Sequence, residues 1–268
     1  MNRIRPAAVS GSFYPRQPEA LAQEVAALLG AVRQRQSVIP KALIVPHAGY
    51  IYSGPVAANA YARLEPGRRQ IKRVVLLGPA HFVAVQGLAL PDSDGFATPL
   101  GMVPLDEPSV ETLSRLPQVL QSKPAHAREH SLEVHLPFLQ TVLEKFTLVP
   151  LAVGDATPDE IADVLDLVWG GEETLIVVSS DLSHYLPYET ARRVDQATAQ
   201  AILDLRESVS HQQACGATPV NGLLLAAQRR CLRPELLDLR NSGDTAGDRS
   251  RVVGYAAFAF NEGAPYVH

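Results

Sequence analysis

Short apolar runs that end at glycine, proline or a polar residue recur along the chain and predict buried β-strands. They lie at residues 42–45, 71–77, 146–153, 174–178, 236–239 and 252–260. Elsewhere the apolar positions follow the helical i, i+3/i+4, i+7 spacing, as Leu21, Val25 and Leu28 do after Pro18. Further helices are predicted at residues 109–116, 129–146, 188–205 and 218–230, after Thr157-Pro158, and from Pro55 as a first helical residue. Strands that alternate with helices in this way indicate an α/β fold.

Histidines follow three of the predicted strands. His47 comes just after the first run and Pro46, His81 follows the second run in the turn GPAH, and His184 follows the fourth run in SSDLSH. Ligands of open α/β sheets bind outside the carboxyl ends of the strands, so a metal-competent side chain there is a candidate site residue. Because sequential parallel strands are usually neighbours, we expect His47 and His81 to face each other across adjacent strand ends. The alternative for each histidine is a hydrogen-bonded structural role.

A fourth candidate histidine lies in the predicted helix at residues 129–146. Its spacing His130-x-x-Glu133-x-His135 superficially resembles a zinc-protease motif. Residues five apart lie about 140° apart around a helix, so the two histidines do not share a face and the zinc-protease interpretation is excluded. We expect His130, at the helix N-terminus, to be able to project into a site, and His135 to be packed or solvated.

Composition bounds the class of protein. The chain has 268 residues, of which 46% are hydrophobic and 19% charged, and a formal net charge of -4. One α/β domain spanning residues 1–268 is expected, because a chain of this length can bury one substantial core. The negative charge argues against nucleic-acid binding, and no apolar run is long enough to cross a membrane. Only two cysteines are present, so a disulfide scaffold is excluded and a reducing, cytoplasmic setting is expected.

The two cysteines have different surroundings in the sequence. Cys231 ends a predicted helix among apolar neighbours and is expected to be a small buried hydrophobe. Cys215 lies beside Gly216 in a loop just before a helix N-terminus, where a thiolate would be stabilised. Cys215 is therefore the cysteine expected to take part in chemistry.

Strand-end histidines together with Cys215 form a candidate metal site of His, His and Cys. Two imidazoles and a thiolate suit Fe(II), Cu or Zn, and three protein ligands leave a position open for water or substrate. Separate structural roles for these residues remain an alternative. A cysteine hydrolase with Cys215 as nucleophile and His184 as base is a second alternative. A serine hydrolase using Ser180, Asp181 and His184 is weaker, because the G-x-S-x-G elbow is missing.

Six motifs in order along the chain resemble the Memo family, which is component B of the AmmeMemoRadiSam group: RPAAVSGSFYP, PHAGYIYSGPVAANAY, LGPAHF, EHSLEVHLPFL, SSDLSHY and CGATPVNGLL. The resemblance covers nearly the whole chain. It implies a three-layer α/β/α domain similar to class III extradiol dioxygenases of the LigB type, with a metal site at the strand ends. It further implies that His47, His81 and Cys215 bind the metal, with Cys215 where those dioxygenases have a carboxylate.

The same resemblance implies roles for residues around the metal. His184 and His130 fall where the dioxygenases have acid/base histidines, with Asp181 supporting His184. Phe13, in the N-terminal loop, falls where eukaryotic Memo has an aromatic side chain lining its binding pocket. These residues define the expected catalytic and substrate-binding set.

The function expected from this resemblance is metal-dependent redox or dioxygenase-like chemistry with non-haem iron or copper and a small-molecule or peptide ligand. The rival expectation is a non-catalytic scaffold that binds phosphopeptides, as eukaryotic Memo has been viewed. AMMECR-type and radical SAM proteins of the same system are the expected protein partners.

Overall fold

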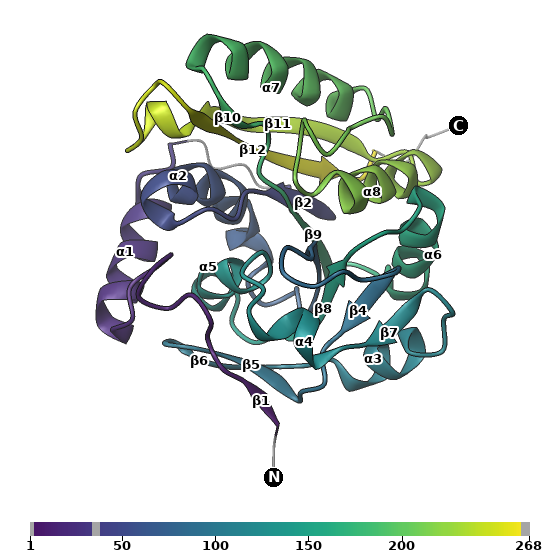
Figure 1. Cartoon of the computed structure of the whole chain (residues 1–268). Coiled ribbons are helices and arrows are strands. Elements are labelled where there is room, and N and C mark those ends of the chain that lie inside the picture. Colours follow the sequence, from purple (N-terminus) through teal and green to yellow (C-terminus); the bar gives the residue numbers. More distant parts are fainter. Residues whose placement is uncertain (1–2, 34–37, 264–268) are drawn as a thin grey trace.

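The computed structural model describes residues 3–33 and 38–263, and within them a nine-stranded mixed sheet forms the centre of the molecule (Figure 1). The strand order is β10-β12-β2-β9-β3-β8-β4-β7, with β11 also paired to β12. The strands are β2 (Ala42–Val45), β3 (Arg73–Pro79), β4 (Leu88–Leu90), β7 (Val119–Gln121), β8 (Thr147–Val153), β9 (Thr174–Ser179), β10 (His184–Leu186), β11 (Arg233–Asn241) and β12 (Val252–Asn261).

A small second sheet and the helices complete the fold. The second sheet joins β1 (Ile4–Arg5), β5 (Gly95–Thr98) and β6 (Gly101–Pro104). The α-helices are α1 (Pro18–Gly30), α2 (Tyr50–Tyr61), α3 (Glu107–Leu113), α4 (Lys123–Ala127), α5 (Leu136–Val142), α6 (Pro158–Val168), α7 (Tyr188–Leu203) and α8 (Ala217–Arg229). The 3-10 helices are η1 (Ala62–Gly67), η2 (Glu133–His135) and η3 (Ser242–Asp244).

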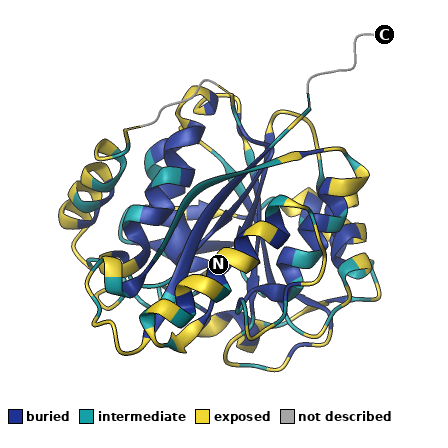
Figure 2. Ribbon diagram, turned by 90° about the horizontal axis from the view of Figure 1, so that it is seen from above, coloured by how far each residue is buried: buried dark blue, intermediate teal, exposed yellow. Residues whose placement is uncertain are grey.

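The large sheet is covered on both faces, which makes three layers. Side chains of a strand alternate between faces, so Leu43 and Val45 of β2 join the core cluster under α1, α2 and α5. Ala42 and Ile44 join the second cluster, which α6 and α8 cover. Figure 2 shows the central strands in the dark blue of buried residues. The expected three-layer α/β/α fold is confirmed. No helix within the described ranges combines the length and apolar character needed to span a bilayer.

The strand order differs from the expectation in one respect that matters for the site. β9 lies between β2 and β3 and is parallel to both, so β2 and β3 are not adjacent. The prediction of adjacent strand ends for His47 and His81 is therefore wrong. The carboxyl ends of β2, β9 and β3 nevertheless meet at one edge of the sheet, because all three strands run in the same direction.

Two proline positions correct the predicted helix boundaries. Helix α2 begins at Tyr50, so Pro55 lies inside it. Pro55 has no N–H to donate to the carbonyl of Ile51, but Ile51 is 65% exposed and water can replace this hydrogen bond. The expected helix at 129–146 is only η2 followed by α5. Pro137 explains the shortening, since inside a continuous helix its ring would clash with the carbonyl of Glu133. His130 consequently lies in a loop.

Cys231 is exposed rather than buried, so the prediction of a buried hydrophobe is wrong. Cys231 has a positive backbone angle, φ 54°, just after the end of α8. Its N–H donates to the carbonyl of Gln228, and the N–H of Leu232 donates to the carbonyl of Ala227. This is a Schellman C-cap, whose left-handed residue points outward and whose next residue makes the apolar contact. Leu232, 4% exposed, takes the buried position.

Candidate metal centre

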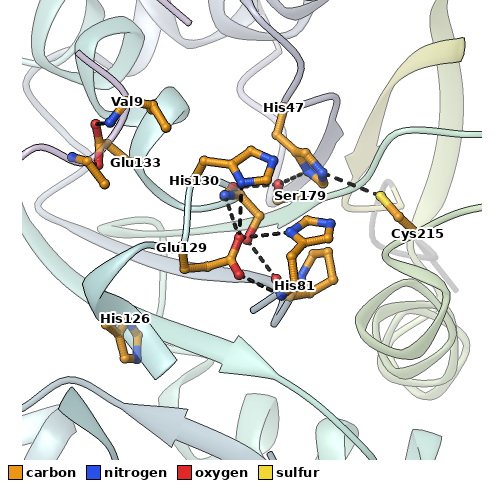
Figure 3. A network of polar contacts seen from close by, with 12 residues as sticks. Val9, His47, His81, His126, Glu129, His130, Glu133, Ser179 and Cys215 are labelled. Carbon is orange, nitrogen blue, oxygen red and sulfur yellow. Dashed lines mark hydrogen bonds and ion pairs between the residues drawn. The ribbon is translucent and has the colours of Figure 1, made fainter. Parts of the chain in front are cut away.

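Three histidines from separate loops converge at the carboxyl edge of the sheet (Figure 3). His47 follows β2, His81 follows β3, and His130 lies between α4 and η2. Their ring centroids are 5.2 Å apart for His47 and His81, 5.5 Å for His47 and His130, and 4.7 Å for His81 and His130. One ring nitrogen from each lies within 4.8 Å of the others, a spacing that could hold a metal ion.

Hydrogen bonds fix the tautomer of His47. Its Nδ1 lies 2.6 Å from the hydroxyl of Ser179, and that hydroxyl donates its single proton to the carbonyl of Ser131 at 2.6 Å. Nδ1 must then carry the proton that it shares with Ser179, which leaves a lone pair on Nε2 facing the cluster. Burial, together with repulsion from His81 and His130, holds the pKa of His47 well below its usual value. His47 is thus a neutral imidazole with a free nitrogen.

Glu129 orients His81 in the same way. Its carboxylate accepts from Nδ1 of His81 at 2.8 Å and from the backbone N–H of His81 at 2.6 Å, and also from the N–H of Ser131 at 2.9 Å. Burial by itself would raise the pKa of Glu129, but the hydrogen bonds and charge of His81 and the N–H of Ser131 lower it to about 2. A carboxylate behind a histidine is the arrangement that directs a ligating nitrogen toward a metal.

His130 is packed between this pair and the N-terminal loop. Its ring stacks on His81 with an interplanar angle of 18°, and its Nδ1 lies 3.6 Å from Oε1 of Glu129. Burial and the charge of His81 lower the pKa of His130 to about 4. Phe13 covers the ring, with centroids 4.9 Å apart, and its carbonyl accepts from the N–H of Tyr50. The structure therefore places Phe13 at the cluster.

Cys215 lies on the far side of His47 from this stack (Figure 3), with Sγ 3.4 Å from Nε2 of His47. It precedes Gly216, the N-cap of α8. Burial and the neighbouring Asp181 raise the pKa of the thiol to about 12. The N–H of Gly216 at the helix N-terminus lowers this pKa, as the sequence led us to expect, but by less than burial and Asp181 raise it. A nearby cation would be required to stabilise the thiolate, and a metal ion bound to His47 would supply one.

Asp181 supports His47 rather than His184. Its Oδ1 accepts from the backbone N–H of His47 at 2.8 Å, and its Oδ2 lies 4.0 Å from Nε2 of the same residue. Burial raises the pKa of Asp181 to about 7. The ring of His184 instead donates from Nδ1 to the carbonyl of Leu182 at 2.8 Å. The expected support of His184 by Asp181 is wrong in this geometry.

His184 is outside the group of three histidines whose ring nitrogens approach one another. Burial and the charge of His81 lower its pKa, and the hydrogen bond to Leu182 opposes that shift. Because the bond to Leu182 places the proton on Nδ1, Nε2 is free to accept one. The thiol of Cys215 contacts His47 and the carbonyl of Asp181, so the cysteine-hydrolase alternative, in which His184 is the base, has no matching hydrogen bond among the described residues.

Residues that the sequence analysis did not single out hold the histidines. Glu129 and Ser179 each bond an Nδ1 atom, and the only signal for either was its place beside a candidate, before His130 and at the end of β9. We expected His135 to be either packed or solvated, and it is packed. Its Nδ1 lies 2.8 Å from the hydroxyl of Tyr61.

The donor set fits a transition-metal ion. The three imidazoles offer one ligand atom each within 4.8 Å of one another, and the thiol of Cys215, outside that group, lies 3.4 Å from Nε2 of His47. Fe(II), Cu and Zn accept such nitrogen and sulfur ligands. The hydrogen bonds of Ser179 and Glu129 already select the ligating tautomers of His47 and His81. The site can thus bind a metal with little rearrangement of its supporting bonds.

Known proteins are similar in sequence to this chain over nearly its full length. A family profile described as Memo-like protein matches residues 5–259. A MEMO1 family protein of Aquifex aeolicus is 37% identical, covering 96% of this chain and 99% of its own length. One from Methanosarcina barkeri is 35% identical, covering 95% and 98%. The uncharacterized protein JW3007 of Escherichia coli K12 shares the fold at TM-score 0.52 and 14% identity, over 81% of this chain and 98% of that one. The chain therefore belongs to the Memo-like family.

Proposed function

We propose that the protein is a metal-dependent oxidoreductase in which His47, His81 and Cys215 hold one iron or copper ion and His130 and His184 handle protons. The observation that carries the proposal is the approach of His47 and His81, whose rings are 5.2 Å apart and whose Nδ1 atoms are held by Ser179 and Glu129, with the thiol of Cys215 3.4 Å from Nε2 of His47. An iron or copper ion there would supply redox chemistry and open coordination positions for a ligand.

Ring geometry favours Cys215 over His130 as the third ligand. The lone pair of an imidazole nitrogen lies in the plane of its ring, so an ion binds best when it lies in the planes of all its ligands. His81 and His130 stack within 18° of parallel with their centroids 4.7 Å apart, and two stacked rings are poorly placed to direct their in-plane lone pairs at one ion. His47 is nearly perpendicular to both rings and can share an ion with either. Because Glu129 orients His81 as a ligand, we take His81 and not His130 to be the metal ligand of this stacked pair.

His130 and His184 are suited to proton transfer. Both have depressed pKa values, so each is neutral near pH 7 and can accept a proton from a ligand bound at the cluster. His184 has its accepting nitrogen free, and Phe13 shields His130 from water. A cytoplasmic setting belongs to the same proposal, since Cys215 must stay reduced to act as a ligand. Association with AMMECR-type and radical SAM proteins stays a prediction.

The test is metal analysis of protein purified without oxygen, with variants of each ligand. His47→Ala and His81→Ala should lose the metal, and Cys215→Ser should lose the sulfur-to-metal absorption band of the Cu(II) or Co(II) form. His130→Gln should keep both metal and band. The exposed His211 provides a matched control, and His211→Ala should behave as the parent protein. Metal retained in His47→Ala, or a sulfur band retained in Cys215→Ser, would contradict the proposal.

Turnover needs its own measurement. Oxygen uptake by the iron-loaded protein with a panel of catechols should occur and should fall in His184→Ala by about 100-fold or more, the usual contribution of a general base. Metal binding without oxygen uptake for any catechol would contradict the dioxygenase-like form of the proposal and favour a binding scaffold.

A further inference from the structure

A buried carboxylate from α7 binds the backbone just before His184. Helix α7 lies along β10, β11 and β12 (Figure 1), and its residue Asp195 is only 2% exposed. Oδ1 of Asp195 accepts from the N–H of Ser183 at 3.0 Å. Burial raises the pKa of Asp195 to about 6, although hydrogen bonding to Ser183 lowers it, and within the described ranges no cation is paired with it. A buried carboxylate without a cation is costly, so its place here calls for an explanation.

Gly254 in β12 makes room for this carboxylate. A Cβ atom at Gly254 would lie 2.1 Å from Oδ2 of Asp195 and 2.5 Å from its Cγ, closer than nonbonded atoms approach. The same glycine bonds the segment before His184, since its carbonyl accepts from the N–H of Leu182 and its N–H donates to the carbonyl of Ser183, both at 2.8 Å. Asp195 and Gly254 therefore act together on this short segment.

The segment in turn determines where the ring of His184 lies. Nδ1 of His184 donates to the carbonyl of Leu182 at 2.8 Å, so the ring is bonded to the segment that it follows. The next residue, Tyr185, has φ 58°, a conformation that bulky side chains rarely adopt, and the pairing of β10 with β12 shifts register across it. A strained residue keeps its conformation only where the surrounding structure imposes it. The bonds described above fix the turn on the side that precedes His184.

We infer that Asp195 is the positioning residue of His184: it holds the backbone of Ser183 and thereby the ring tautomer of His184 that leaves Nε2 free to accept a proton. Asp195 acts through the backbone rather than on the ring, whereas the acid nearer in sequence, Asp181, is engaged with His47. The inference deepens the proposed function, on which the use of that tautomer in proton transfer rests. The positioning itself can be measured without metal or substrate.

The test reads the tautomer of His184 by nitrogen NMR of metal-free protein labelled in its histidine rings, with His184→Ala to assign the signal. In the parent protein the proton should lie on Nδ1. In Asp195→Ala it should be shared between both ring nitrogens, because the carbonyl of Leu182 is no longer held in place. Asp195→Asn should keep the parent tautomer, since an amide oxygen still accepts from the N–H of Ser183. Glu189→Ala, which removes an exposed acid of the same helix, is the matched control and should resemble the parent.

Gly254→Ala disturbs the same contact from the other partner. Its methyl group would displace the carboxylate of Asp195, so the variant should lose stability and show the mixed tautomer. In Asp195→Ala/Gly254→Ala the clash is gone, so the melting temperature should recover relative to Gly254→Ala while the tautomer stays mixed. A merely structural role for Asp195 would instead restore the tautomer together with the stability.

Two measurements separate this inference from the proposed function. Zinc affinity in Asp195→Ala should match that of the parent in a chelator competition, because Asp195 bonds Ser183 and not a proposed ligand. In the oxygen-uptake assay Asp195→Ala should lower kcat about tenfold or more with little change in KM, and it should add nothing in His184→Ala. A protein that takes up no oxygen would contradict the proposed function, while the tautomer would still decide the positioning role.

Asp195→Leu keeps the shape of the side chain without its acceptor, and it replaces Asp195→Ala if that variant does not fold. A mixed tautomer in either variant, with the parent tautomer in Asp195→Asn, supports the inference. A parent protein without the proton on Nδ1, a parent-like tautomer in the variants that lack the acceptor, or an equal change in Glu189→Ala would overturn it.

Discussion

Glu133 ties the N-terminal loop to the site, and its replacement by glutamine is expected to destabilise the protein strongly. The fully buried carboxylate accepts from the guanidinium of Arg5, from the N–H groups of Ala8 at 2.7 Å and Val9 at 3.0 Å, and from the hydroxyl of Tyr14 at 2.5 Å. The side chains of Arg5 and Glu133 are 4% and 0% exposed. One carboxylate thus serves four donors in a dry environment.

The size of the effect follows from burial. Glu133→Gln keeps the shape, but it removes the charge that compensates Arg5 and turns an amide N–H₂ group toward donors. Breaking a buried ion pair on one side costs about 3–5 kcal/mol. Domains have about 5–15 kcal/mol of stability in total, so the variant should fold with a much reduced margin. At about 2–4 °C per kcal/mol for a chain of this size, the melting temperature should fall by about 10 °C.

Urea unfolding at neutral pH measures this loss, and an exposed ion pair provides the control. Glu111→Gln breaks the bond to Arg115 on the surface of α3, where both side chains are more than 70% exposed, and should cost less than about 1 kcal/mol. If Glu133→Gln and Glu111→Gln lower the unfolding free energy by similar amounts, the reasoning about the buried network is refuted.

The network also predicts a functional consequence. Arg5 donates to the carbonyls of His126 at 2.8 Å and Glu129 at 2.5 Å, so it binds the segment that leads into His130. Loosening the loop frees Phe13 from His130. Zinc affinity in Glu133→Gln should therefore fall even under conditions where the variant is fully folded, whereas Glu111→Gln should bind zinc as the parent does.

Three further changes test other parts of the structure. Burial lowers the pKa of His126 to about 4, although its Nε2 donates to the carbonyl of Ala89. The unfolded state therefore binds more protons than the folded state between pH 4 and 6.5, and stability falls by up to about 3 kcal/mol as the pH drops through that window. His126→Gln should flatten this part of the plot of urea midpoint against pH, and an unchanged slope would contradict the reasoning. The ammonium of Lys41 donates its three N–H groups to the backbone carbonyls of Trp169 and Gly171, both at 2.7 Å, and of Thr174 at 2.9 Å. Lys41→Met should lower the unfolding free energy by about 2–4 kcal/mol in urea, whereas a change below about 1 kcal/mol would argue against the bonds. Ser179→Ala removes the hydrogen-bond acceptor that fixes the tautomer of His47 and should weaken zinc binding about 10–100-fold in a chelator competition. Unchanged zinc affinity would show that zinc binding does not depend on this hydrogen bond.

The sequence predicted the central strands β2, β3, β8 and β9 well because each is an apolar run buried on both faces, a local signal. It did not predict which strands pair. The placement of β9 between β2 and β3 depends on contacts between residues more than 100 positions apart, and no local pattern records them. The helix starts were missed for a related reason: Pro55 and Pro137 obey local rules, but the hydrogen bonds that decide where helices begin, such as that from the N–H of Tyr50 to Phe13, are long-range.

The assignment of Asp181 shows how a pairing error of this kind reaches the site. In the sequence Asp181 lies three residues before His184, and the likeness to dioxygenases suggested that it supports this histidine. In the structure β9 runs beside β2 with Val45 opposite Ser179, and the N–H of Ser180 donates to the carbonyl of Val45. This register carries the next residue past the end of β2, where its carboxylate meets the N–H of His47. An acid and a histidine at strand ends therefore pair according to which strands are neighbours, so that the strand order must be known before a partner can be assigned.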